Sequence, residues 1–317
     1  MPIGLGLASS HAPSLVAPLD QWEPLYERFT QGVPQPPEAA AETAAVIRGY
    51  LERIGRAFAT LREELASYQP DLLIIVGGDQ SEMFDRSNVP NLMIYVGDAA
   101  PASWTPPGAP PGAEEHLTVK VDEETSRRLL DKLVRAEDFD VAISTEQRAL
   151  GPRGRGLPHA FYRPLPLLTP EIDVPVVLIY ENTYDPPSLA ASRCYELGQA
   201  LERLLRDDPR RIAIYGSGGL SHDPGGPRSG WIDEPLDRWF LEQLSHGDGR
   251  KTTAMYSFDS LTMRGGTGEM RAWITVAGAM EEAGCRATVV DYIPAHHAVT
   301  GLGWAYWPQN GHTDGRP

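Results

Sequence analysis

Hydrophobic positions along the chain follow two alternating patterns, short apolar runs and longer stretches of helical period. In one long stretch, apolar side chains recur at alternating steps of three and four: Ala44, Ile47, Leu51, Ile54, Phe58, Leu61 and Leu65. This spacing places them on one face of a helix, which is expected to end near Pro70. Further helices are predicted in residues 122–136, 189–206, 233–245 and 269–283.

Short runs rich in β-branched and aliphatic residues predict strands between these helices. They lie in residues 3–8, 72–76, 91–96, 141–144, 174–180, 212–215 and 287–292. Strands that alternate with helices are typical of an α/β fold with a mixed, mainly parallel sheet and helices on both faces. Ligands of such sheets bind beyond the strand ends, in the connecting loops.

Two segments interrupt this pattern. Residues 98–112, DAAPASWTPPGAPPG, are so rich in Pro, Gly and Ala that we expect an irregular surface excursion or a lid. Residues 308–317 are expected to form a flexible tail. Because there is no internal repeat and no domain linker, we expect residues 1–307 to form a single domain, with room for two lobes.

Composition narrows the classes of partner. The formal net charge of −15 argues against nucleic acid, because phosphate binding needs clustered Lys and Arg. The two cysteines, Cys194 and Cys285, match no metal spacing and no disulfide framework, which fits a reducing cytoplasm. The apolar runs are far shorter than the ~20 residues of a membrane helix, so we expect a soluble protein and no membrane partner.

Polar and titratable side chains cluster after the predicted strands and in glycine-rich turns. They are His11 after IGLGLASS, Asp79, Gln80 and Glu82 after LLIIVGG, His159 in GLPHAFYRPL, His222 at the end of IAIYGSGGLSH, and Glu269 in RGGTGEMRAWI. Each has an ordinary structural interpretation, such as a helix N-terminus for Glu269 or a turn cap for Asp79 and Gln80. Their repetition at successive strand ends predicts a site.

Several other motifs fail on inspection. The glycines of GLGLAS lie inside the first strand, which argues against a dinucleotide loop. Tyr215 occupies the first glycine position of a nucleophile elbow, which argues against a serine hydrolase. His296 and His297 are adjacent and point opposite ways in an extended segment, so we expect only one of them, His297, to line a pocket and contact substrate.

Taken together, these motifs resemble a known family. SSHAPSL, GDQSEMF, LPHAFYRPL, IAIYGSGGLSHDPGG, GTGEMRAWITVAGAM and DYIPAHHAVTGLGWAYW resemble the class III, LigB-like extradiol ring-cleavage dioxygenases. Within them, the chain is most similar to the branch of the protocatechuate 4,5-dioxygenase β-subunit and 3-O-methylgallate dioxygenase. The resemblance spans nearly the whole chain. It implies a three-layer α/β/α sandwich and a non-haem Fe(II) that opens a catecholic, protocatechuate- or gallate-like ring with O₂.

The resemblance also implies roles for individual residues. His11 and Glu269 match metal ligands of a 2-His-1-carboxylate site. His222 matches the general base and later acid, and His159 a second histidine that contacts the substrate hydroxyl or reactive oxygen. Arg163, which flanks His159 together with Arg153 and Arg155, is expected to pair with a substrate carboxylate. A homodimer or a small accessory subunit is expected as partner.

Gln80 departs from the family pattern, because many members carry the second histidine ligand at this position. An amide oxygen can bind Fe(II), but it is neutral and a weaker donor than imidazole. We therefore expect Gln80 to be a weak ligand, with Asp79 or Glu82 coordinating directly or holding the amide. Two alternatives remain open: a Zn²⁺-dependent hydrolase or lyase in the same pocket, and a non-catalytic relative that binds an aromatic ligand or a protein.

Overall fold

A mixed sheet runs through the computed structural model, which describes residues 3–104, 115–146, 156–170 and 173–308. Its eight strands follow the order β6-β3-β7-β2-β8-β1-β10-β9. Their bounds are β1 Leu5–Ser9, β2 Leu72–Gly77, β3 Leu92–Tyr95, β6 Ala142–Ser144, β7 Val176–Glu181, β8 Ile212–Ser217, β9 Thr288–Ala295 and β10 Thr300–Trp307. Neighbours from β7 through β2 and β8 to β1 run parallel, whereas β10 is antiparallel to both β1 and β9.

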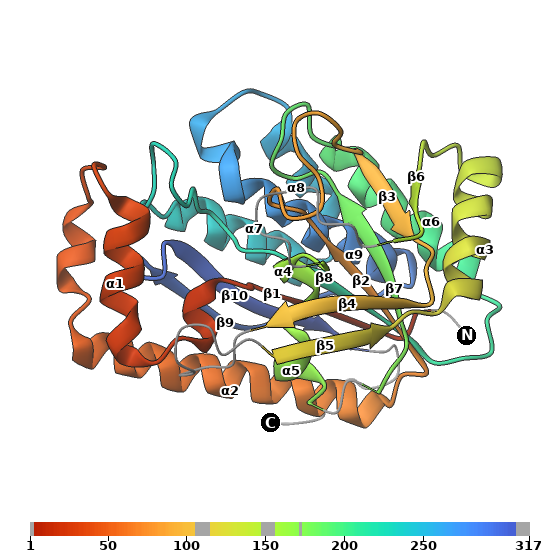
Figure 1. Ribbon diagram of the computed structural model, residues 1–317, viewed down its shortest axis with the longest axis horizontal. Helices are drawn as coiled ribbons and strands as arrows, with labels where there is room; N and C mark the ends of the chain where they lie inside the picture. Colours follow the sequence, from red (N-terminus) through yellow and green to blue (C-terminus); the bar gives the residue numbers. More distant parts are fainter. Residues whose placement is uncertain (1–2, 105–114, 147–155, 171–172, 309–317) are drawn as a thin grey trace.

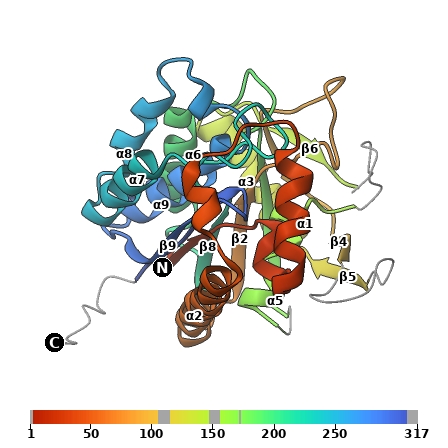
Figure 2. The same ribbon diagram turned by 90° about the vertical axis from the view of Figure 1, so that its left-hand side faces the viewer.

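Helices cover both faces of this sheet, so the predicted α/β sandwich is confirmed (Figures 1 and 2). One face carries α2 (Ala44–Tyr68) with the short α4 (His159–Tyr162) and α5 (Leu165–Leu168), and α1 (Leu19–Thr30) packs beside α2. The other face carries α6 (Ala191–Leu205) and α9 (Met270–Glu282), flanked by α3 (Glu123–Ala136), α7 (Glu234–His246) and α8 (Gly249–Thr252).

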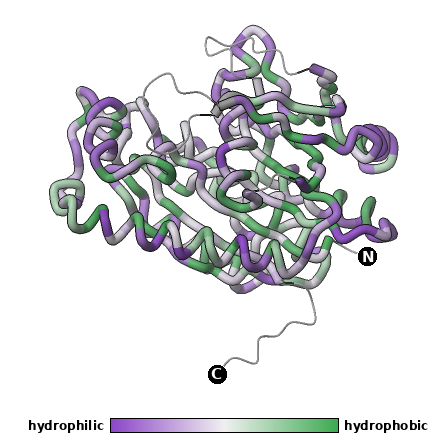
Figure 3. Tube along the Cα trace, turned by 60° about the horizontal axis from the view of Figure 1, so that its bottom comes forward, coloured by the Kyte–Doolittle hydropathy of each residue, from purple (hydrophilic) through white to green (hydrophobic). Residues whose placement is uncertain are grey.

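The alternation of side chains in β2 explains how one strand serves both layers. Leu73 and Ile75 are buried in the cluster that contains α2, whereas Ile74 and Val76 are buried in the cluster that contains α6 and α9. A strand buried on both faces reads as a continuous apolar run, as LLIIV does. Helix α2 needs only one apolar stripe, and its turns alternate between hydrophobic and hydrophilic in Figure 3.

One segment differs from the prediction. Within residues 98–112, Ala99–Trp104 forms β4, which pairs antiparallel with β5 (Glu115–Lys120) in a separate two-stranded sheet. Pro101 is tolerated at an edge of this ribbon, where its carbonyl accepts the N–H of Leu157 at 2.9 Å. Residues 105–112 lie outside the described part of the chain, as do residues 309–317 of the predicted tail.

The cysteines and the lengths of the helices are two further features of the described residues. Cys194 and Cys285 are both buried and free, in agreement with the absence of a disulfide framework. Among the described residues, every helix is too short or too polar to cross a bilayer.

Helices α6 and α9 pack unusually closely through glycines. A methyl group on Gly198 would collide with the carbonyl oxygen of Thr275, and one on Gly278 would collide with that of Tyr195. By contrast, a methyl group on Gly55 of α2 would point into open space. Glycine therefore has a packing role in α6 that it lacks in α2.

We predict that Gly198→Ala lowers the free energy of unfolding by about 1–3 kcal/mol, because the added methyl group overpacks the helix interface. The matched control, Gly55→Ala, should raise it by about 0.5–1 kcal/mol, because alanine favours a helix without meeting a neighbour. Urea unfolding of both variants measures the two changes. A stabilised Gly198→Ala protein would contradict the close packing of α6 on α9.

Candidate functional site

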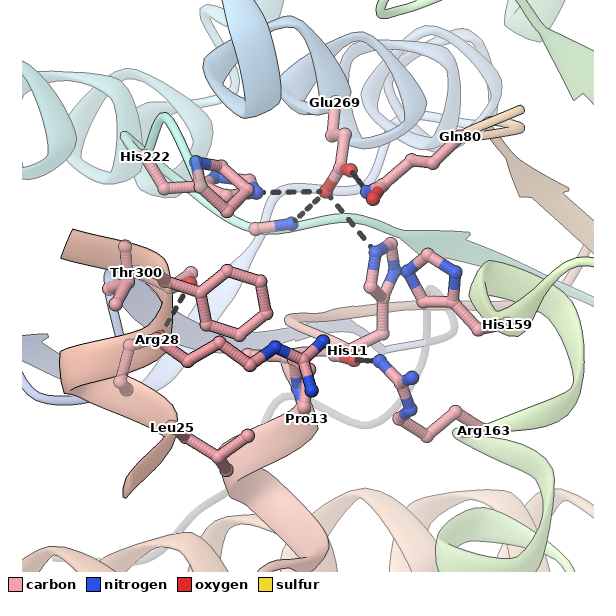
Figure 4. Close-up of a pocket in the computed structure, with 16 residues that line it drawn as sticks. His11, Pro13, Leu25, Arg28, Gln80, His159, Arg163, His222, Glu269 and Thr300 are labelled. Carbon is pink, nitrogen blue, oxygen red and sulfur yellow. Dashed lines mark hydrogen bonds and ion pairs between the residues drawn. The ribbon is translucent and has the colours of Figure 1, made fainter. Parts of the chain in front are cut away.

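A cavity of about 410 Å³ opens where β1, β2 and β8 end. Because these neighbouring strands are parallel, their carboxyl ends meet at one edge of the sheet and bring their following loops together. The cavity is lined by six of the predicted residues: His11, Gln80, His159, Arg163, His222 and Glu269 (Figure 4). The order of the strands in the sheet thus brings together residues that lie far apart in the sequence.

The carboxylate of Glu269 lies at the centre of these residues, and only 1% of Glu269 is exposed. Its Oε2 lies 3.3 Å from Nε2 of His11 and 3.6 Å from Nε2 of His222, and it accepts the N–H of Gly219 at 2.9 Å. Although burial alone raises the pKa of this carboxyl, the neighbouring His11 and His222 and these hydrogen bonds hold the pKa well below its usual range. Glu269 is therefore ionised.

The tautomer of His11 follows from its second nitrogen. The Ser217 hydroxyl donates its one proton to the Ala160 carbonyl, so its oxygen accepts the Nδ1–H of His11 at 3.0 Å. The proton of the neutral ring is therefore on Nδ1, and Nε2 carries a lone pair. This Nε2 is buried without a hydrogen-bond partner, although it faces the Glu269 carboxylate. Such a lone pair is what a metal ion requires of a histidine ligand.

His222 is held in the same way by the loop that contains it. Its Nδ1–H donates to the carbonyl of Leu220 at 2.8 Å, which leaves the lone pair of the neutral ring on Nε2 toward the cavity. A methyl group on Gly219 would lie 2.7 Å from Cε1 of the His222 ring, so glycine is required for this close approach.

The loop after β2 sends its three polar side chains to different places. Asp79 accepts the N–H groups of Glu82, Met83 and Phe84 at 2.9–3.3 Å and caps the loop. Burial raises the pKa of Asp79 to about 6. Asp79 does not line the cavity, so it is not placed for the direct metal contact that was expected, and its hydrogen bonds instead fix the loop that carries Gln80.

Gln80 and Glu82 diverge from Asp79 in opposite directions. The side-chain amide of Gln80 donates to Oε1 of Glu269 at 2.6 Å, so Gln80 is more than a turn residue. Glu82 instead accepts two hydrogen bonds from His159, at Nδ1 (2.8 Å) and at the backbone N–H (3.1 Å). The expected metal contact of Glu82 is therefore replaced by a contact with the second pocket histidine.

His159 lies edge-on to His11, with the ring centroids 4.8 Å apart. Burial, aided by the positive charge of Arg163, lowers the pKa of His159 to about 4 despite the opposing effect of Glu82. The His159 ring is therefore neutral near neutral pH.

The cationic residues differ in part from the prediction. Arg163 lines the cavity, but its Nη1 donates to the backbone carbonyl of His11 at 2.6 Å, which gives it a structural task as well. Arg28 of α1 also lines the cavity and is exposed, and it forms no ion pair with any described residue. Sequence reasoning missed Arg28 because it missed α1. Arg153 and Arg155 lie outside the described residues.

The position of His297 differs from the prediction. Its ring packs against Tyr26 with centroids 4.2 Å apart, its backbone N–H donates to Glu42 at 2.7 Å, and it is not among the residues that line the cavity. Ala298 and Val299 of the turn between β9 and β10, and Thr300 at the start of β10, line the cavity instead. His297 therefore supports this turn.

The donor set fits a divalent cation with a weak third ligand. The His11 lone pair, the ionised Glu269 and the Gln80 side chain converge, and all are donors that divalent transition metals accept. Among the described residues, no three His, Cys, Asp or Glu side chains form a metal-binding group. A metal ion held at this position would therefore need the Gln80 amide as its third protein ligand.

Comparisons with known proteins identify the family of this chain. The family model described as the catalytic LigB subunit of aromatic ring-opening dioxygenase matches residues 6–303. A 2,3-dihydroxyphenylpropionate/2,3-dihydroxicinnamic acid 1,2-dioxygenase of Burkholderia vietnamiensis is 25% identical over 300 residues, which cover 80% of this chain and 88% of that protein. Gallate dioxygenase of Pseudomonas putida is 28% identical over 181 residues, which cover 55% of this chain and 51% of that protein.

A solved structure shares the fold. The uncharacterized protein JW3007 from Escherichia coli K12 superposes with a TM-score of 0.50 at 14% sequence identity, covering 95% of this chain and 99% of that chain. At this identity the likeness concerns the fold alone.

A buried carboxyl group supports the loop that carries His222. Asp237 of α7 is fully buried and accepts hydrogen bonds of 2.8 Å from the Ser221 N–H, the Ser221 hydroxyl and the Tyr292 hydroxyl. Burial raises the pKa of Asp237 to about 7.

We predict a pH-dependent effect of Asp237→Asn. In the unfolded chain this group titrates near its ordinary value of about 3.9. Because its pKa is raised in the folded protein, its contribution to stability is present at low pH and is lost as the pH rises through about 7. The free energy of unfolding of the variant, relative to wild type, should therefore increase between about pH 4 and about pH 7, as measured by urea unfolding. A pH-independent difference would contradict this.

Proposed function

Because the chain belongs to the LigB family of aromatic ring-opening dioxygenases, we propose that it is an Fe(II)-dependent extradiol dioxygenase. It would use O₂ to cleave a catecholic ring next to its two hydroxyl groups. The observation that carries the proposal is the buried, unpartnered Nε2 of His11, whose lone pair faces the ionised carboxylate of Glu269. A divalent cation would bind where this lone pair and this carboxylate converge.

Three residues would hold the iron: His11, Glu269 and Gln80. Bound iron supplies Lewis acidity toward the catechol oxygens and the capacity to react with O₂. The side-chain N–H of Gln80 donates a hydrogen bond to Glu269. The amide must therefore rotate by a half-turn before its oxygen can serve as a ligand.

His222 is the proposed general base. Its Nε2 lone pair is directed to the cavity by the hydrogen bond from Nδ1 to Leu220, and a neutral imidazole is suited to accept a phenolic proton near neutral pH. The same ring returns the proton later as an acid. His159 lines the same cavity and would contact the other polar edge of the substrate.

The rest of the cavity suits an aromatic acid. Pro13, Leu25, Phe29 and Val299 provide apolar surface for a ring. Arg28 places beside it a guanidinium that lies 5.0 Å from the centroid of the Phe29 ring and forms no ion pair with a described residue. A carboxylate substituent at the open end would form a charge-assisted, bidentate pair with Arg28. This supports a protocatechuate- or gallate-like substrate. A homodimer, an accessory subunit and a cytoplasmic location stay predictions.

The proposed activity is tested with a panel of catechols. The protein, reconstituted anaerobically with Fe(II), should consume O₂ with carboxylated catechols and form a yellow ring-opened product, more slowly with unsubstituted catechol. His222→Ala should retain its iron but lower kcat by roughly 10²–10⁴-fold, the range for loss of a general acid–base residue. Visible spectroscopy and O₂ uptake measure both.

Other outcomes would overturn the proposal. Hydrolysis or elimination supported by Zn²⁺ without O₂ uptake would favour a hydrolase or lyase, and binding of catechols without any turnover would favour a non-catalytic relative. Full turnover by His222→Ala would remove His222 from the mechanism.

We predict that Gln80→Ala weakens iron binding by about 10-fold or more, since it deletes a ligand. Gln80→His should strengthen it, because imidazole is the better donor for Fe(II), and Glu269→Ala should abolish binding at micromolar iron. Chelator competition measures the affinities. The matched control is Gln199→Ala, which removes an amide that bonds Glu282 on the surface of α6. An unchanged affinity in Gln80→Ala would limit Gln80 to a contact with Glu269.

A further inference from the structure

Glu82 has a task that the proposed chemistry does not use. Its carboxylate is buried, with 1% of the residue exposed, and a single oxygen, Oε2, accepts both the backbone N–H and the ring Nδ1 of His159. Burying a carboxylate is costly unless hydrogen bonds compensate it. The two hydrogen bonds tie Glu82 to both the backbone and the ring of His159.

The loop that carries Glu82 is shaped to separate it from Gln80. Ser81 adopts a left-handed backbone with φ of 58°, which is uncommon outside glycine. The three N–H groups donated to Asp79 hold this conformation. As a result, Gln80 reaches Glu269 on one side, and Glu82 reaches His159 on the other. Strained backbone of this kind is often kept at functional sites.

The contact with Glu82 decides which nitrogen of His159 is available. A carboxylate only accepts, so Nδ1 of His159 must carry the proton, and the lone pair of the neutral ring is left on Nε2. Because His159 lines the cavity, this lone pair is the part of the ring available to a ligand there. The ring plane is fixed as well, perpendicular to His11 with an interplanar angle of 89° (Figure 4).

We propose that Glu82 is a positioning residue that fixes the tautomer and the orientation of His159, so that Nε2 accepts a hydrogen bond from a hydroxyl group of the substrate. The tautomer is a property of the protein itself, whereas the hydroxyl contact rests on the proposed function. Glu82 thus serves the histidine and not the metal ion.

Two substitutions separate the features of Glu82. Glu82→Gln keeps an oxygen acceptor for Nδ1–H, whereas Glu82→Leu removes every acceptor at similar volume. The matched control is Glu202→Gln, which changes another buried glutamate that accepts a backbone N–H, from Ile3, outside the site. ¹⁵N NMR of histidine-labelled full-length protein without iron reports the tautomer, and His159→Asn identifies the His159 signals.

In wild type and in Glu82→Gln, we expect His159 to be protonated on Nδ1. Glu82→Leu should shift the population toward the Nε2-protonated form and, after iron loading, lower kcat by about 10–100-fold with unchanged iron stoichiometry. Glu82→Gln should retain most of kcat, and Glu202→Gln should match wild type in both measurements. If Glu82→Gln keeps its kcat whereas Glu82→Leu loses it, Glu82 positions His159 through an accepting oxygen.

Two results would overturn the proposal. His159 protonated on Nε2 in the wild-type protein would remove the tautomer argument, whatever the activity. Loss of iron in Glu82→Gln would make Glu82 a metal ligand. Because the NMR measurement needs neither iron nor substrate, failure of the ring-cleavage proposal would leave the result on Glu82 interpretable. If Glu82→Leu does not fold, the wild-type spectrum and Glu82→Gln still decide the question.

Discussion

The buried charge of Glu269 is the constraint on which the rest of the site depends. An ionised carboxylate inside a protein is tolerated only when other groups compensate it. Here the compensation comes from the N–H of Gly219, the amide of Gln80 and the position of Glu269 at the N-terminus of α9, where the helix dipole favours negative charge. His11 and His222 face the same carboxylate through Nε2 and lower its pKa further, so Glu269 is the group on which the polar contacts of the site converge.

The fold brings the residues of the site together through the order of its strands and through close contacts between backbone segments. Strands β1, β2 and β8 are neighbours, so His11, Gln80 and His222 meet although the chain separates them widely. Glu269 reaches the same point from the N-terminus of α9, the helix that packs against β1 and β8. Glycine is needed where these parts meet, since a methyl group on Gly218 would lie 2.8 Å from Cβ of Glu269. The fold and the site are thus built from the same contacts.

Sequence reasoning predicted much of this and failed where local pattern and tertiary context differ. The long helix α2 and the buried strand β2 were predictable because their periods, helical and continuous, are set by which faces are buried. Helix α1 was missed because it is largely polar and contains Pro24, and with it Arg28 was missed. Strand β4 was missed because Pro and Ala disfavour strands in general, whereas the edges of a two-stranded ribbon accept them.

The site was predicted as a set of residues but not as a set of contacts. Motifs named His11, His159, His222 and Glu269, whereas the partners of Asp79, Gln80 and Glu82 depend on the left-handed turn at Ser81, which no motif encodes. The assignment of His297 failed for a similar reason, since the direction of a side chain in a turn depends on the packing of a distant helix.

The same loop explains how an amide can stand at a position where imidazole would bind iron more tightly. An amide has a donor and an acceptor, so without a cation Gln80 can offer its N–H to Glu269, and after a half-turn it can offer its oxygen to a metal ion. A neutral imidazole at this position could satisfy Glu269 only while protonated on the nearer nitrogen, and binding a metal would require that proton to leave. Gln80 therefore avoids coupling metal binding to proton release at this ligand, at the cost of a weaker donor. Since Asp79 holds the loop and Glu82 is engaged by His159, neither carboxylate is free to compensate for the weaker ligand, and the affinity of the proposed iron site would rest mainly on His11 and Glu269.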